Sequence, residues 1–247
     1  MEEVPALNES FAAAKIQGTF VLYDLEQNVW RVHDASRARQ RFVPASTFKI
    51  ANSLIGLDCG AVKDVDEVLP YGGQPQPFPA WEHDMGLREA IRLSAVPIYQ
   101  ELARRIGLKR MRAGVQALAY GNQEIGTVVD RFWLDGPLQI SAVEQTEFLG
   151  RLVQGKLPVK PETLAAVEEI TLQEKTPVYE LHYKTGWSFD QKEPVGWTVG
   201  WVLKDGKYYP FALNLNPIGD EDIPKRVPLV KACLEVFGVL PPAPAKE

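Results

Sequence analysis

Ser46-Thr47-Phe48-Lys49 opens the first strongly helical stretch of this 247-residue chain, which continues through Ile50–Leu57. Residues three apart in a helix are neighbours, so Ser46 and Lys49 can touch while Phe48 faces elsewhere. The stretch is too apolar for a helix washed by solvent, so Lys49 should lie at least partly inside the protein. Burial disfavours the ammonium form and lowers the pKa of a lysine, which would let Lys49 act as a base near neutral pH.

This pair also has an ordinary structural explanation. Lys49 can extend along its aliphatic stem and keep its charge in water. In this alternative Ser46 is a helix N-cap without a chemical role, and Val43-Pro44-Ala45 leads into the helix. Serine and lysine at this spacing occur by chance in many proteins, so the pattern needs companions elsewhere in the chain.

A second hydroxyl lies in Ser94-Ala95-Val96, between two predicted helices. The pattern predicts one helix over Asp84–Leu93 and another over Pro97–Ile106, because proline suits a first helical turn and Gly107 can end the second helix. At such a joint the Ser94 hydroxyl can point into a cleft. The structural alternative is a plain N-cap.

Lys184-Thr185-Gly186 follows a predicted strand. Apolar and polar residues alternate over Val178–Lys184, as in a half-buried strand, and we expect the Lys-Thr-Gly sequence to close it. A lysine and a hydroxyl at a strand end, followed by a glycine that permits close backbone approach, can seat an anionic substrate. Taken singly this is an ordinary strand end, but the three patterns together indicate serine acyl-transfer chemistry.

Two further motifs, Tyr120-Gly121-Asn122 and Phe132-Trp133-Leu134, complete a set that resembles the class D β-lactamases, the oxacillinase family. That family carries S-T-F-K, S-x-V, Y-G-N, a tryptophan in an F-W-L context and K-T-G, and all five occur here in the same order. Class A β-lactamases and penicillin-binding proteins carry Ser-Asp-Asn where this chain has Ser94-Ala95-Val96. The resemblance extends from about Gly18 to Val239.

The resemblance implies hydrolysis of β-lactam antibiotics through an acyl-enzyme formed on Ser46. It also implies that Lys49 takes up carbon dioxide to become N6-carboxylysine, the base that deprotonates serine in acylation and water in deacylation. A carbamate forms only on a neutral amine, which the apolar setting of Lys49 favours. Trp133 matches the tryptophan whose indole N–H donates to the carbamate, and its alternative is an ordinary core aromatic. No metal and no other cofactor than carbon dioxide or bicarbonate is implied.

The same resemblance implies roles around a bound substrate. Ser94 would pass a proton toward the lactam nitrogen, and Lys184 would hold the substrate. The backbone N–H groups of Ser46 and Trp187 would form the oxyanion hole. Arg226 stands where the family has its carboxylate-binding arginine, with a solvated charge at a helix start as the alternative. The residues implied in substrate binding are Val96, Tyr120, Asn122, Thr185, Gly186, Trp187 and Arg226.

Val96 separates two functions that share the other motifs. The membrane-bound β-lactam sensors resemble class D enzymes but carry asparagine at this position, and they stay acylated because the carbamate is lost. A valine beside Lys49 offers a displaced proton no polar partner, so turnover is expected rather than sensing. The alternative function is a β-lactam sensor or penicillin-binding domain that is acylated but turns over slowly. A non-catalytic scaffold fits less well, because every motif is retained.

Other features bear on the surroundings of the cleft. Trp81, Met85, Trp187 and the loop 188–194 are expected to line its mouth, which leaves the range of β-lactams open. Tyr120-Gly121-Asn122 is typical of a turn and is expected to support the site from a loop between helices.

The predicted fold class is α+β, with the penicillin-recognition fold of the resembling family: an antiparallel sheet flanked by helices, with an inserted helical subdomain. Ser141-Ala142-Val143-Glu144 predicts a capping box before an apolar helix. Strands are expected at 18–24, 29–33, 178–184, 195–203 and 208–214, and a last helix at 224–237. Residues 1–247 would form a single domain, with a sheet lobe from 1–45 and 176–247 and a mostly helical lobe from 46–175.

Composition limits the partners. A net charge of −5 without a dense run of Lys or Arg argues against nucleic acid and anionic membranes. The chain has no run of ~20 apolar residues that would predict a transmembrane span. His33, His83 and His182 are far apart and lack cysteine neighbours, which argues against a zinc site. A small-molecule β-lactam is the expected partner, and the protein would be a monomer or a homodimer.

Cys59 and Cys233 are the only thiols, and we expect them to behave as small buried hydrophobes rather than as a disulfide. The start Met1-Glu2-Glu3 lacks the basic and apolar regions of a secretory signal. Because the resembling family works in the periplasm, we expect a periplasmic or secreted native protein whose leader peptide is absent from this chain, with a cytoplasmic homologue as the alternative. The Pro-rich tail 241–244 is expected to fray.

Overall fold

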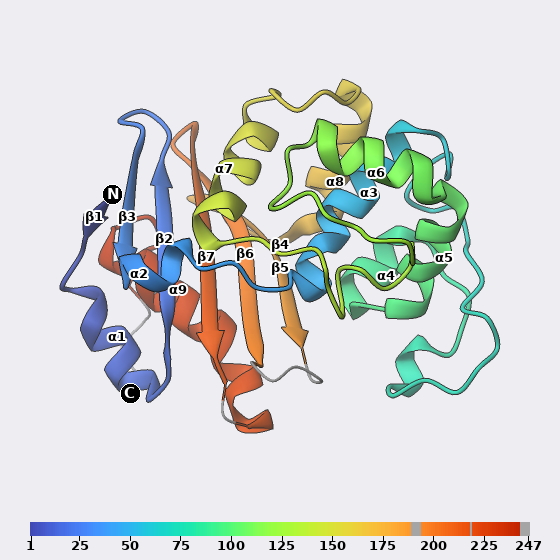
Figure 1. Ribbon diagram of the computed structural model, residues 1–247. Coiled ribbons are helices and arrows are strands. Elements are labelled where there is room, and N and C mark those ends of the chain that lie inside the picture. Colours follow the sequence, from blue (N-terminus) through green and yellow to red (C-terminus); the bar gives the residue numbers. More distant parts are fainter. Residues whose placement is uncertain (189–193, 218, 243–247) are drawn as a thin grey trace.

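One sheet takes its strands from both ends of the chain (Figure 1). The computed structural model describes residues 1–188, 194–217 and 219–242. Within them, seven strands lie in the order β1-β3-β2-β7-β6-β5-β4, so β2 and β7 join the N-terminal hairpin to the C-terminal strands. The strands are β1 (Glu2–Glu3), β2 (Gln17–Asp24), β3 (Val29–His33), β4 (Leu172–Lys175), β5 (Tyr179–Ser188), β6 (Val195–Lys204) and β7 (Lys207–Asn216).

The sheet is mixed, which corrects the expectation of a purely antiparallel one. Strand β1 runs parallel to β3, through the pairs Glu2–Arg31 and Glu3–Val32. The other neighbouring strands are antiparallel. Two residues are too few for an alternating pattern to appear in the sequence, so β1 gave no signal.

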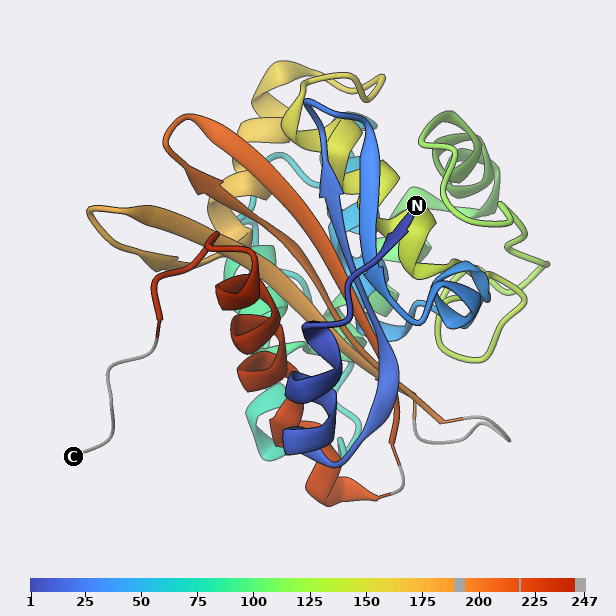
Figure 2. The same cartoon turned by 90° about the vertical axis from the view of Figure 1, so that its left-hand side faces the viewer.

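The helices form two groups, one on each face of the sheet. Helices α1 (Leu7–Ala14) and α9 (Arg226–Val236) lie side by side on one face, as Figure 2 shows. On the other face α7 (Ala142–Val153) packs on β2 and β7, with α2 (Ala35–Arg39) beside it. Further from the sheet lie α3 (Lys49–Asp58), α4 (Leu87–Leu93), α5 (Val96–Ile106), α6 (Leu108–Ala117) and α8 (Pro161–Thr171), with 3-10 segments η1 (Ala45–Phe48), η2 (Pro79–Trp81) and η3 (Asp220–Lys225) elsewhere in the chain.

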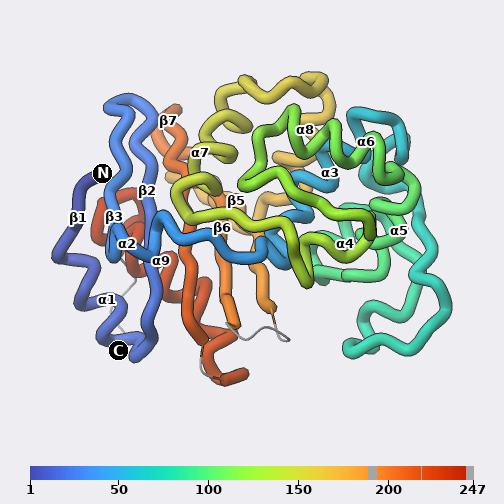
Figure 3. The backbone as a smooth tube through the Cα atoms, viewed as in Figure 1, coloured from blue at the N-terminus to red at the C-terminus, as the bar shows by residue number. Residues whose placement is uncertain are grey.

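Alternating side chains of the central strands build two hydrophobic cores. Phe211 and Leu213 of β7 face the core that includes α1 and α9. Ala212 and Trp197 belong to the larger core on the opposite face, which also contains Phe48 and the buried residues of α3. Helix α3 therefore lies between the sheet and the outer helices (Figure 3), where its position is fixed from both sides.

Several predicted elements are confirmed. The hairpin of β2 and β3 is present; β6 extends one residue past its predicted end, and β7 extends two. Helix α7 begins with the expected capping box: the Glu144 N–H donates to Ser141 Oγ at 3.2 Å, and the Ser141 N–H donates to Glu144 Oε2 at 2.9 Å. Glycine follows the last helix at Gly238, with a φ of 64°.

Other boundaries were wrong. Strand β5 continues to Ser188, so Lys184-Thr185-Gly186 lies inside it instead of closing it, because backbone pairing with β6 runs on through Gly186. The helix predicted from Asp84 starts at Leu87, since the Asp84 carboxylate accepts the Tyr71 N–H at 3.0 Å in a loop. The last helix starts at Arg226 after a 3-10 segment that contains a proline. Helices α1 and α2 and strand β4 were not predicted.

The remaining expectations concern cysteines, membranes and loops. Both thiols are free; Cys233 is buried, which raises its pKa to about 12, whereas Cys59 is only partly buried. None of the helices described is both long enough and apolar enough to cross a bilayer. Residues 189–193 of the expected cleft loop lie outside the described residues, as does the tail from residue 243. The division into two lobes stays a prediction.

Candidate active site

The turn that carries Ser46, here called the Ser46 turn (residues 45–48), forms η1 and leads directly into α3. Thr47 Oγ1 donates to the Pro44 carbonyl at 2.7 Å and so closes the turn. Every residue of 42–50 is buried except Ser46, which is partly exposed. Lys49 Nζ donates to Ser46 Oγ at 2.9 Å, so the contact predicted from the spacing is confirmed. A solvent-accessible hydroxyl thus touches a buried amine.

The surroundings of Lys49 are aromatic. Its side chain is fully buried, and Nζ lies 5.2 Å from the centre of the Tyr99 ring. Burial, and then the charge of Lys184, hold the pKa of Lys49 well below its usual range. The alternative in which Lys49 reaches water is therefore wrong. An amine in this setting loses its proton more readily than an exposed lysine, and the neutral form can accept a proton or react with an electrophile.

Trp133 forms part of the same pocket. Its ring is fully buried and stacks on Phe48 at 5.5 Å between centroids, and its carbonyl accepts the Ala45 N–H at 2.9 Å. The indole Nε1 is buried and has no hydrogen-bond partner among the described residues. Buried donors are nearly always paired, so this one is suited to an acceptor that the protein chain itself does not provide.

Helix α5 brings the second motif to this pocket. Tyr99 is bound to α3 twice: Asn52 Nδ2 donates to its carbonyl at 3.2 Å, and its hydroxyl lies 2.9 Å from Ser53 Oγ. Val96 is the first residue of α5 and lies one helical turn before Tyr99, whose ring lies over Lys49 Nζ. The role of Val96 as an apolar neighbour of the amine stays a prediction.

Two residues of the motif segments, Ala45 and Ser94, have a strained backbone. Ala45 and Ser94 have φ values of 49° and 59°, in the left-handed region that non-glycine residues rarely adopt. Ser94 ends α4, whereas the N-cap of α5 is Ala95, so Ser94 is not the plain N-cap of the alternative explanation. Such strain is characteristic of functional sites.

The third motif lies on β5, along an edge that faces the Ser46 turn. Strand β4 pairs with β5 only as far as His182, so among the described strands residues 183–188 pair with β6 alone. A Cβ on Gly186 would meet the Pro44 carbonyl oxygen at 3.0 Å and Thr47 Cγ2 at 3.1 Å. Only glycine permits this approach, which sets the strand edge directly against the turn.

Two cations lie along this strand. Lys184 is buried, and Nζ donates to the Thr185 carbonyl at 2.8 Å; burial, and then the charge of Arg226, lower the pKa of Lys184 to about 7. Arg226 donates from Nη1 to the Gly186 carbonyl at 2.7 Å and from Nε to the Ile223 carbonyl at 2.8 Å. Burial lowers the pKa of Arg226 to about 10; the residue is partly buried at the start of α9, and its part in binding a carboxylate stays a prediction.

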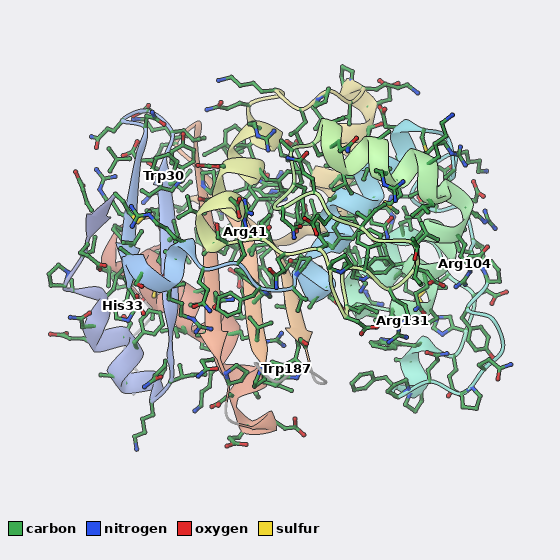
Figure 4. The ribbon with its side chains drawn as sticks, viewed as in Figure 1. Trp30, His33, Arg41, Arg104, Arg131 and Trp187 are labelled. Carbon is green, nitrogen blue, oxygen red and sulfur yellow. The ribbon has the colours of Figure 1, made fainter. Side chains whose placement is uncertain are left out.

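Trp187 completes this part of the site. Its ring centre lies 5.7 Å from the guanidinium carbon of Arg226, a cation–π distance. Figure 4 shows Trp187 at the lower end of the sheet and Arg131, two residues before Trp133, at the lower edge of the helices. The open position of Ser46 thus has helices on one side and a cationic strand edge on the other.

Known proteins share this arrangement. Residues 11–235 match the family model of the penicillin binding protein transpeptidase domain. The chain is 39% identical to β-lactamase OXA-10 of Pseudomonas aeruginosa, over 94% of this chain and 89% of that protein, and 39% identical to β-lactamase OXA-48 of Klebsiella pneumoniae, over 97% and 91%. It superposes with a TM-score of 0.93 and 44% identity on FUS-1 (OXA-85), a class D β-lactamase from Fusobacterium nucleatum subsp. polymorphum, covering 97% of this chain and 100% of that one.

The chain belongs to the class D β-lactamases. Its fold is the penicillin-recognition fold of that family. Class D β-lactamases are serine enzymes that cleave the β-lactam amide bond without a metal cofactor. In residues 1–188, 194–217 and 219–242 of this member, no three His, Cys, Asp or Glu side chains are grouped to hold a metal ion.

In this class D β-lactamase the Tyr120-Gly121-Asn122 motif shapes a loop. Tyr120 is fully buried, with its ring edge-on to Phe48 at 5.5 Å. Asn122 Nδ2 donates to the Pro137 carbonyl at 2.9 Å, and its Oδ1 accepts the Gln139 N–H at 3.0 Å. These contacts agree with the supporting role predicted for the motif. Direct contact of Tyr120 or Asn122 with a substrate stays a prediction.

Sequence reasoning missed several residues of this class D site. Tyr99 and Asn52 line the wall beside Lys49, and Gln145 of α7 donates from Nε2 to Thr47 Oγ1 at 3.0 Å. Gln145 and Thr47 are 98 residues apart. The sequence gives no clear signal for Gln145, because its neighbours Glu144, Thr146 and Glu147 are also polar.

Proposed function

We propose that this class D β-lactamase hydrolyses β-lactam antibiotics through an acyl-enzyme on Ser46, with a carboxylated Lys49 as the base for both steps. One observation carries the proposal: Lys49 Nζ is buried, 2.9 Å from the Ser46 hydroxyl, and without a carboxylate partner among the described residues. A lone buried ammonium is unstable, so the amine loses its proton readily.

The residues around Lys49 suit a carboxyl group on its nitrogen. A neutral amine adds to carbon dioxide and releases one proton, so a buried cation is exchanged for an anionic carbamate that can serve as a base. An anion requires donors, and Trp133 Nε1 is a buried donor that no described residue engages. Ser46 offers a second donor through its hydroxyl.

In acylation Ser46 Oγ attacks the carbonyl carbon of the lactam, and carboxylated Lys49 takes the hydroxyl proton. The backbone N–H groups of Ser46 and Trp187 stabilise the charge that develops on the carbonyl oxygen. The ring carbon–nitrogen bond then breaks, and the proton taken up by carboxylated Lys49 passes through Ser94 to the leaving nitrogen, which restores the base. In deacylation carboxylated Lys49 takes a proton from water as that water attacks the ester carbonyl carbon; the bond to Ser46 Oγ then breaks, and the same proton is returned to Ser46 Oγ.

Substrate binding is assigned to the edge of β5. Lys184 and Arg226 offer cations to the carboxylate of a penicillin or cephalosporin, and an arginine can bind it through two donors. Thr185 adds a hydroxyl, Gly186 lets the strand edge lie close to the Ser46 turn, and Val96 contributes an apolar wall. The native protein would meet these substrates in the periplasm or as a secreted enzyme, where its family works.

The test is hydrolysis of a chromogenic cephalosporin at low and high bicarbonate, by the parent, Lys49→Ala and Lys109→Ala. Lys109 is exposed on α6 and is the matched control. We expect turnover that rises with bicarbonate in the parent and in Lys109→Ala, and that is lost in Lys49→Ala. Stoichiometric acylation without turnover would identify the alternative, a β-lactam sensor or penicillin-binding domain. Absence of acylation by a labelled penicillin would point to a scaffold.

A further inference from the structure

Gln145 connects the sheet-packed helix α7 to the Ser46 turn through a buried chain of hydrogen bonds. Its side chain is 1% exposed. Nε2 donates to Thr47 Oγ1 at 3.0 Å, and Thr47 Oγ1 donates to the Pro44 carbonyl at 2.7 Å. At its other end Gln145 Oε1 accepts the Tyr120 hydroxyl at 3.4 Å. The amide thus holds the turn from one side and the buried tyrosine from the other.

Helix α7 is a rigid support for this amide. It packs on β2 and β7, and its first turn is fixed by the capping box of Ser141 and Glu144. Arg41, four residues before the Ser46 turn, donates to the Glu144 carboxylate from Nε at 3.0 Å. An apolar side chain would fill the Gln145 position without the free-energy cost of burying an amide. The hydrogen bonds of the Gln145 amide are therefore the reason for a polar residue at this position.

Gln145 holds in place the part of the Ser46 turn that packs against β5. Thr47 and the Pro44 carbonyl are the groups that a Cβ on Gly186 would meet, at 3.0–3.2 Å. The Ser46 N–H lies between these two anchored residues, and the Trp187 N–H follows Gly186 directly. The distance between the two N–H groups therefore depends on how the turn is seated against the strand.

We propose that Gln145 is a positioning residue that sets the Ser46 turn against β5 and thereby holds the oxyanion hole in its working geometry. The inference rests on the proposed function, because it assigns those two N–H groups to the substrate carbonyl. Gln145 acts through Thr47 and Pro44 and not through Lys49, so its loss should slow acyl transfer while leaving carboxylation of Lys49 intact. A misplacement near 1 Å at a reacting centre costs up to about 10²-fold in rate.

The experiment compares Gln145→Met and Thr47→Val, which remove opposite ends of one hydrogen bond, with Thr146→Val. Thr146 is the next residue of α7 and is fully buried; among the described residues its hydroxyl bonds to the Val143 carbonyl of the same helix alone, at 2.8 Å. Three quantities are measured: the pre-steady-state acylation rate with a fluorescent penicillin, its non-covalent dissociation constant, and the ¹³C signal of Lys49 after labelling with ¹³C-bicarbonate.

We expect acylation to fall by about 10- to 100-fold in Gln145→Met and in Thr47→Val, with the dissociation constant and the ¹³C signal kept. The double variant should lose less than the product of the two single losses, because the two residues share one hydrogen bond, while each also has a bond of its own. Thr146→Val should acylate at the parent rate. Acylation at the parent rate in Gln145→Met, or an equal loss in Thr146→Val, would overturn the inference.

A readout independent of chemistry separates this inference from the proposed function. The ¹⁵N–¹H resonance of Ser46 should move in Gln145→Met and stay in place in Thr146→Val. If the parent protein is not acylated by any penicillin, the proposed function fails. The Ser46 resonance still shows whether Gln145 fixes the position of the Ser46 turn. An unmoved resonance would overturn the positioning role.

Discussion

Cations of this protein occupy two contrasting regions. On the outer side of α5, Arg105 is partly exposed and lies 2.7 Å from Glu67 and 3.3 Å from Glu101. In the active site, Lys49 and Lys184 are buried, and neither forms an ion pair with a carboxylate within the described parts of the chain. The charge of Arg105 is balanced by two carboxylates, whereas the two active-site lysines have no carboxylate partner among the described residues.

The difference indicates what each region is for. A partly exposed ion pair adds little free energy and does no chemistry. Buried amines without a counterion destabilise the folded state, and they persist where an anion completes the site. At Lys49 that anion is proposed to be a carboxyl on the amine itself, and at Lys184 and Arg226 it is proposed to be the carboxylate of the substrate. Four substitutions test this contrast.

The largest effect is expected from Trp133→Phe, which keeps an aromatic ring and removes the unpartnered donor. Without that N–H the carboxyl on Lys49 loses a hydrogen bond, so deacylation should slow by about 10²- to 10⁴-fold, the range for a lost general base. Mass spectrometry would show accumulated acyl-enzyme, and stopped-flow absorbance would show a burst. Trp30→Phe is the control, because Trp30 Nε1 is also buried without a partner among the described residues but lies on β3. Equal deacylation rates in both variants would contradict the role of Trp133.

Val96→Asn should give a smaller loss. An amide one turn from Tyr99 would offer the Lys49 ammonium a polar partner, so the uncarboxylated form should gain stability. A hydrogen bond to a charged group contributes about 1.5–3 kcal/mol, which corresponds to a rise of about 10- to 100-fold in the bicarbonate concentration needed for half-maximal turnover. Acylation should be retained while deacylation slows. Val96→Ile is the apolar control, and a bicarbonate dependence shared by Val96→Asn and the parent would argue against this account.

Lys184→Met tests the second buried amine through stability. An unfolded lysine titrates near ~10.4, and folded Lys184 titrates at about 7. Between these values the unfolded chain binds more protons, so the parent gains stability as the pH rises, and the penalty of charged Lys184 is fully present below pH ~7. The methionine variant should exceed the parent at pH ~6 by up to about 4 kcal/mol, with the gap closing toward pH ~10. Denaturant titrations at several pH values measure this, with exposed Lys109→Met as the control; a gap for Lys184→Met that does not change with pH would show that Lys184 is not the cause.

What the sequence could predict followed local geometry. The Ser46–Lys49 contact and the capping box at Ser141 span three residues, and helix geometry alone brings such residues together. The hairpin of β2 and β3 and the start of α5 are also short-range patterns. These elements could be located without knowledge of the tertiary structure.

The predictions that failed, and the contacts that were missed, concern features that depend on packing between residues far apart in the sequence. Strand β5 was ended too early because its continuation past Gly186 is decided by pairing with β6. The contact between Arg226 and Gly186 joins residues 40 apart, and that between Asn52 and Tyr99 joins residues 47 apart. No rule of sequence spacing links such positions. The motifs could therefore indicate the chemistry, but not which other residues hold the motif residues in place.

The smallest effect is expected from Arg105→Gln, on the surface side of the contrast. Its ion pairs with Glu67 and Glu101 are partly exposed, where water and salt screen the attraction and ordering long side chains offsets much of it. We expect the melting temperature to fall by at most about 3 °C, and this difference to vanish in ~1 M salt, where the screening length is only ~3 Å. Cephalosporin turnover and its bicarbonate dependence should match those of the parent. A loss of turnover without a loss of stability would mean that surface cations contribute to the electrostatic potential at Lys49 and Lys184. The surface and the active site would then not be electrostatically independent.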